Sequence, residues 1–80
     1  MALFRLRTKP VEARRYTDAG IGEMIDWLGY AWAGIDDHDL LIDNRSGRVR
    51  ARTGEWVVKE DGTFSVYEPE LFHEAYEAAT

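Results

Sequence analysis

Alternating arginines are the feature of this sequence best suited to chemistry. Two segments have the pattern of a β-strand with one basic face, because alternate side chains project from the same face of a strand. The basic residues are Arg5, Arg7 and Lys9 in the first segment and Arg48, Arg50 and Arg52 in the second. If the two strands are neighbours with these faces aligned, six cations form a ladder suited to phosphate groups, which arginine binds through paired hydrogen bonds. Tyr30 or Trp32 would add a stacking surface. The candidate ligands are an anionic nucleotide signal and a nucleic-acid strand.

The alternative for these cations is pairing with carboxylates on adjacent strands, which would make them structural. The 80-residue chain has 15 acidic side chains against 10 Lys and Arg, a net charge of −5, so acidic partners are plentiful. The same charge argues against a general DNA-coating protein, because such binding is driven by neutralising phosphates. Nucleic-acid binding is therefore the weakest of the functions considered for the ladder.

The sequence gives little indication of a catalytic or metal-binding site. The absence of cysteine removes disulfides, cysteine-ligated zinc, iron–sulfur clusters and thiol catalysis together. No serine lies in a nucleophile elbow, and neither histidine has an evident carboxylate to orient it. The acidic run 36–39 lacks the alternate ligand spacing of a calcium loop and is expected to be a solvated turn. We therefore expect no catalytic residues, no metal and no cofactor.

The first basic strand is expected to continue past Pro10 with a change of phase. Proline cannot donate to a strand ladder, so a bulge or strand edge at this position would explain the change. Beyond it, Val11 and Ala13 are expected to face the core. Three residues are expected to face outward, namely Glu12, Arg14 and Tyr16.

Apolar residues at helical spacing predict two helices. The first follows the capping residues Thr17 and Asp18, and Gly29 is positioned to end it. Its apolar stripe consists of Ile21, Met24, Ile25 and Leu28. Pro69 suits the first turn of the second helix. The buried side of that helix is expected to consist of Leu71, Phe72, Ala75 and Tyr76.

The rest of the chain consists of strand-like runs separated by short turns. Asn44–Gly47 and Asp61-Gly62 are typical hairpin turns. Connections this short favour antiparallel pairing. The sequence therefore predicts a single α+β domain over residues 1–80, with a small, mostly antiparallel sheet of about six short strands. One of the two helices follows the first strand and the other lies at the C-terminus.

Two segments of the chain also share a pattern with known proteins. Residues 9–13 read K-P-V-E-A, and residues 54–59 read G-E-W-V-V-K, followed by Phe64, P-E-L-F at 69–72 and Y-E at 76–77. Over residues 9–17 and 54–77 the chain resembles a family of small phage and prophage proteins. Ser65 and Val66 depart from the family's pattern, which has an aromatic residue and then a proline there. The resemblance implies a phage origin and action in the bacterial host, and it implies no activity.

The apolar residues that carry the resemblance are expected to be structural, because a hairpin that packs on a C-terminal helix would bury such side chains. They are Trp56, Val58, Phe64, Phe72 and Tyr76.

Taken together, these patterns predict a non-enzymatic binding module. Its first candidate partner is a host or phage protein, and the alternative is a nucleotide held by the arginine ladder. No apolar run approaches the ~20 residues of a membrane helix and no signal peptide is evident, so we expect a cytoplasmic protein without membrane contact. Because a domain this small buries only about 60% of its unfolded surface, we also expect a homo-oligomer.

Overall fold

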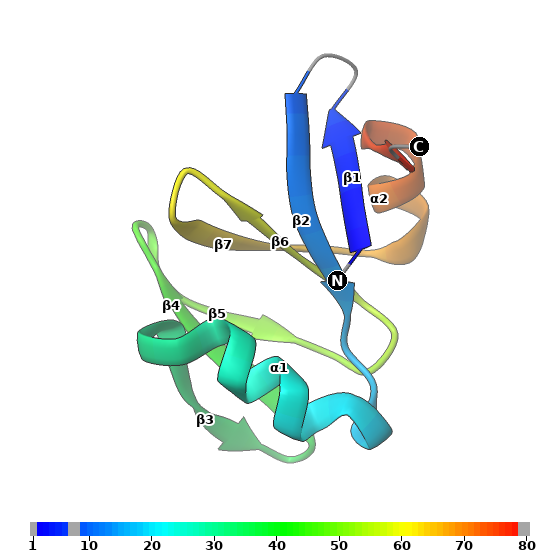
Figure 1. Ribbon diagram of the computed structural model, residues 1–80. Coiled ribbons are helices and arrows are strands. Elements are labelled where there is room, and N and C mark those ends of the chain that lie inside the picture. Colours follow the sequence, from blue (N-terminus) through cyan, green and yellow to red (C-terminus); the bar gives the residue numbers. More distant parts are fainter. Residues whose placement is uncertain (1, 7–8, 79–80) are drawn as a thin grey trace.

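Two antiparallel sheets and two short helices make up the fold (Figure 1). The computed structural model describes residues 2–6 and 9–78. A five-stranded sheet has the order β7-β6-β2-β1-β8, and a three-stranded sheet has the order β3-β4-β5. The predicted α+β class is therefore confirmed, although the described residues divide into eight strands and two sheets where about six strands in one sheet were expected.

The strands of the larger sheet are β1 (Ala2–Leu6), β2 (Lys9–Arg15), β6 (Trp56–Glu60), β7 (Thr63–Tyr67) and β8 (Glu77–Ala78). Those of the smaller sheet are β3 (Trp32–Asp36), β4 (Asp39–Asn44) and β5 (Gly47–Ala51). The helices are α1 (Ile21–Leu28) and α2 (Pro69–Ala75), and α1 lies between the 3₁₀ turns η1 (Asp18–Gly20) and η2 (Gly29–Ala31).

The N-terminal segment is a hairpin and not one interrupted strand, which corrects the prediction for Pro10. β1 and β2 pair antiparallel, from Ala2 opposite Ala13 to Leu6 opposite Lys9. The change of phase near Pro10 therefore accompanies a chain reversal. On its other side β2 pairs with β6 only from Glu12 onward, so the ladder between these two strands needs no N–H from Pro10.

α1 forms where the apolar stripe predicted it. The Thr17 hydroxyl accepts a hydrogen bond from the Gly20 backbone N–H (3.2 Å), which caps the η1 turn that leads into the helix. Gly29 ends the helix at φ 58°, a left-handed conformation that glycine adopts without strain. Met24 and Leu28 are buried, so the stripe faces the core as expected.

The five-stranded sheet is covered on both faces. α2 covers one face, where Phe72 stacks on Trp56 with ring centroids 4.2 Å apart. The core on this face consists of Val11, Ala13, Val58, Phe72 and Tyr76. α1 and the three-stranded sheet cover the other face, where Tyr16, Val57 and Phe64 are buried together with Leu40 and Ile42 of β4.

Two predicted orientations are wrong. Tyr16, which directly follows β2, was expected to face outward but is only 1% exposed, because α1 and β4 pack on the side that it faces. Its hydroxyl donates to the His38 carbonyl (2.8 Å). Leu71 was expected to be buried but is 51% exposed, because α2 contacts the sheet through the side that carries Phe72 and Tyr76. Phe64 is buried on the face opposite α2, where its ring meets Trp27 of α1 edge-on.

Phe72 and Leu71 are adjacent on α2 and should differ sharply in their contribution to stability. Phe72→Ala should lower the free energy of unfolding by about 3–5 kcal/mol, since it empties a fully buried aromatic site. Leu71→Ala should cost less than about 1 kcal/mol, since half of that side chain is in solvent. Urea denaturation of the two variants measures both values. Equal losses would contradict the orientation of α2 described above.

Tyr16 should make the fold sensitive to alkali. Burial raises the pKa of Tyr16 above its ordinary 10.0, and the charges of Asp18 and Asp39 raise it further. The folded state therefore favours the neutral phenol, so this contribution to stability is complete below pH 10.0 and is lost as the pH rises above it. Tyr16→Phe should make the decline of Tm with pH above 10.0 less steep. Tyr30→Phe, at a side chain fully in solvent, should keep the wild-type slope.

Candidate functional site

The two basic strands of the predicted ladder lie in different sheets. Arg5 lies on β1 and Lys9 begins β2, in the five-stranded sheet, and Arg7 lies outside the described residues. The second basic strand is β5 of the three-stranded sheet, and Arg52 lies beyond its end. Within the described chain β1 is hydrogen-bonded to β2 and β8, and not to β5. The two basic strands are not neighbours, so the condition on which the ladder depended is not met.

The arginines of β5 are paired with carboxylates. Arg48 Nε donates to Asp43 Oδ1 (2.9 Å) across the β4–β5 hairpin. Arg50 bridges two strands, with Nη2 2.7 Å from Asp36 Oδ2 and Nη1 3.0 Å from Asp39 Oδ2. Hydrogen bonds to these carboxylates raise the pKa of both arginines. The structure thus has the cross-strand pairing that was the alternative to the ladder, and a phosphate group would have to compete with carboxylates already in place.

The acidic run 36–39 forms the turn between β3 and β4. Asp37 and His38 have positive φ angles of 50° and 70°, and the hydrogen bond from Tyr16 to the His38 carbonyl ties the turn to β2. Asp36 and Asp39 converge on Arg50. In the described part of the chain no three His, Asp or Glu side chains gather as metal ligands.

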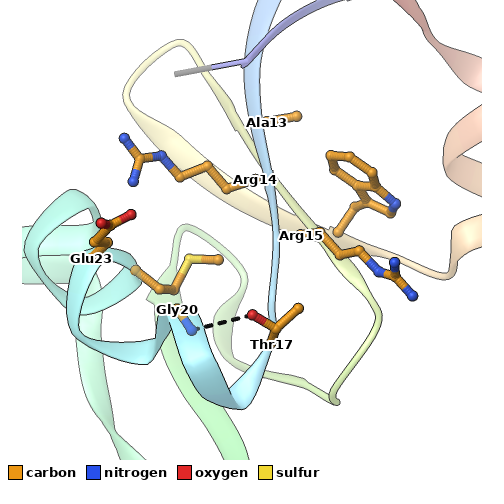
Figure 2. A pocket seen from close by; sticks show the side chains of 8 residues that line it. Ala13, Arg14, Arg15, Thr17, Gly20 and Glu23 are labelled. Atoms are coloured by element: carbon orange, nitrogen blue, oxygen red, sulfur yellow. Dashed lines mark hydrogen bonds between the residues drawn. The ribbon is translucent and has the colours of Figure 1, made fainter.

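An open hollow of about 390 Å³ lies beside the end of β2 (Figure 2). Arg14 and Arg15 extend to opposite sides of the strand there, and Glu23 of α1 lies on the side of Arg14. A second hollow also has Arg14 and Glu23 in its lining, together with Asp26 and Trp27. The two hollows therefore contain charges of both signs, which makes neither of them a simple anion site.

Arg14 is a residue that the sequence analysis did not single out. Its guanidinium lies over the Trp27 ring, 5.2 Å from the centroid, and Trp27 Nε1 in turn donates to Glu12 Oε2 (3.1 Å). Arg14 Nε is buried, and no described atom accepts a hydrogen bond from it. The stacking on Trp27 accounts for the position of this side chain, because a guanidinium is attracted to the face of an indole.

Three of the four large hydrophobic residues that are exposed in the described chain lie in η2 and β3. Tyr30 is fully exposed, Trp32 is 40% exposed and Ile35 is 47% exposed. These three residues are called the β3 surface below. Tyr30 and Trp32 were considered only as a stacking surface for a base, and Ile35 was not considered. Gly34 within this strand pattern was the available signal, because an isolated glycine in a strand indicates a bulge.

Among the described residues, no helix has both the length and the apolar character of a membrane span. No protein-family model, curated protein or solved structure matches this chain.

The two arginines of β5 should contribute unequally to stability through their ion pairs. Arg50→Ala removes contacts to both ends of the β3–β4 turn, whereas Arg48→Ala removes one contact within a hairpin. We expect Tm to fall in the order wild type, Arg48→Ala, Arg50→Ala. The differences should shrink in about 1 M salt, because salt weakens the attraction between solvent-exposed charges and the side chains of these pairs are partly in solvent. Differential scanning calorimetry at low and high salt measures this. An unchanged Tm for Arg50→Ala would contradict a structural role for its ion pairs.

Proposed function

We propose that this protein is a non-enzymatic module that binds another protein through the β3 surface. The observation that carries the proposal is the exposure of Tyr30, Trp32 and Ile35 within six residues of chain. Apolar groups gathered in this way on a small domain are typical of interaction sites. Tryptophan and tyrosine are also the residue types that most often dominate the affinity of a protein interface.

The segment of chain that carries the β3 surface is acidic and favours a basic partner. Residues 16–44 contain seven acidic residues and no Lys or Arg. Asp37 is exposed at the turn that follows β3. A complementary basic partner would approach faster and in a preferred orientation, because opposite charges steer the encounter.

A nucleotide ligand has less support than a protein partner. The ladder that would have bound it is divided between two sheets, and Arg48 and Arg50 are neutralised by neighbouring carboxylates. The hollow beside Arg14 has carboxylates in its lining as well. We therefore propose a protein partner, and the resemblance to phage proteins makes a bacterial lysate the source in which to seek it.

The test is a pull-down that compares the wild type with a variant of the β3 surface. The double variant Tyr30→Ala, Trp32→Ala should lose a partner that the wild type recovers, and the purified pair should bind at least about tenfold more weakly. Leu71→Ala is the control, because it removes an exposed apolar side chain from α2, away from the β3 surface. That control should retain the partner.

Two results would contradict the proposal. One is a partner that the wild type and the double variant recover equally, which would place its binding site elsewhere. The other is a wild-type protein that recovers nothing above the level of the double variant. Circular dichroism of each variant shows that a loss of binding is not a loss of folding.

A further inference from the structure

β3 is an edge strand of the smaller sheet (Figure 1). In the described chain its only strand partner is β4, so the backbone groups along its outer side have no sheet partner. β5, at the opposite edge, also pairs only with β4 in the described chain, but its exposed side chains are Arg48 and Arg50 and not apolar groups. Unpaired N–H and C=O groups in a row are a template for another strand.

The exposed apolar residues of β3 project from the core-facing side of its sheet. Ile35 is directly opposite Leu40, and Trp32 is directly opposite Ile42. Residues opposite each other in an antiparallel pair share a face of the sheet. Leu40 and Ile42 are fully buried, so Trp32 and Ile35 also face the core side of the sheet. They stay exposed because no described strand lies along the outer side of β3. A fourth strand beside β3 would supply that neighbour.

A bulge is what places both residues on this face. Trp32 and Ile35 are three positions apart, and in a regular strand an odd spacing puts side chains on opposite faces. The register of β3 on β4 shifts between Trp32 and Gly34, which inserts one extra residue and restores the common face. The strand thus presents two apolar side chains together along its open edge.

The charges beside β3 indicate what kind of strand would bind. Three carboxylates, on Asp36, Asp37 and Asp39, lie around the β3–β4 turn, and Arg50 is paired with two of them. The side chain of Asp36 remains 60% exposed even in this pair. A strand next to β3 would therefore gain from positively charged side chains on the outward face and apolar ones on the core-facing side.

We propose that β3 accepts an extended, basic segment of the partner protein as a fourth strand of the β3-β4-β5 sheet. This inference rests on the proposed function and adds the mode of binding and the chemistry of the partner. Main-chain hydrogen bonds to the open edge provide affinity. The apolar residues of the segment cover Trp32 and Ile35, and its basic residues meet the carboxylates at the turn.

The test uses a synthetic peptide of about eight residues in which Lys and Val alternate, a length typical of a strand. In ¹⁵N NMR at millimolar peptide, the amides of residues 32–36 should shift saturably and exchange with solvent more slowly, whereas the amides of 48–51 should change little. A peptide of the same sequence with alternate backbone nitrogens methylated should not bind, since it lacks the N–H groups that pair with β3. A Glu–Val peptide should bind at least about tenfold more weakly.

Two matched variants test whether the peptide binds at the edge of β3. Ile35→Lys places a charge on the open edge and should abolish binding of the Lys–Val peptide. Leu71→Lys makes the same change at an equally exposed position on α2 and should leave binding intact. Thermal melts of both variants verify that each is folded.

Three results would overturn the inference. The amides of residues 32–36 do not respond to the Lys–Val peptide, or the methylated peptide binds equally well, or these amides respond to dilution of the protein alone, which would assign the edge to a second copy of the chain. If a protein partner still depends on Trp32 after any of these results, the proposed function stands and only the strand addition fails. If the partner is also independent of Trp32, both fail.

Discussion

Burial of β6 on both faces is the constraint on which the rest of the structure depends. Val57 and Val58 are adjacent on this strand and point to opposite faces, and neither is exposed. Both faces of the larger sheet must therefore be covered. α2 covers one face, and α1 with β4 covers the other. β4 supplies the buried Leu40 and Ile42, and β5 lies against β7. β3 is one of the edge strands of the described chain, and it is the edge that carries the exposed Trp32 and Ile35.

The sequence predicted those features that depend on neighbouring residues. The stripe of α1, its end at Gly29 and the turns at Asn44–Gly47 and Asp61-Gly62 all follow from local spacing and backbone preference. Prediction from the sequence failed for the features that depend on contacts between distant segments. The exposure of Tyr16 was predicted on the assumption of a one-sided sheet, and nothing in the sequence near Tyr16 indicates that α1 returns to cover it. The division of the strands into two sheets also depends on contacts between distant segments.

In the candidate site, too, some features could be predicted from neighbouring residues and others depend on distant segments of the chain. The pairing of Arg48 with Asp43 was predictable, because a turn at residues 45–46 places these two residues opposite each other. That register alone would have argued against a free arginine on β5. The β3 surface was not predictable, because a strand becomes an edge only through the order of the strands around it. Arg14 lies over a tryptophan 13 positions further along the chain, which again depends on tertiary structure.

The features that make β3 a binding edge also limit what it binds. Natural edge strands are commonly short, bulged or charged, which prevents them from pairing with copies of themselves. β3 has five residues and a bulge, and a run of carboxylates begins at its end. Two copies of this edge paired in parallel would bring like charges together, at a cost that a basic strand does not incur. The carboxylates near the turn therefore favour a basic partner, while the exposed Trp32 and Ile35 provide the apolar contact that a strand in either direction would need.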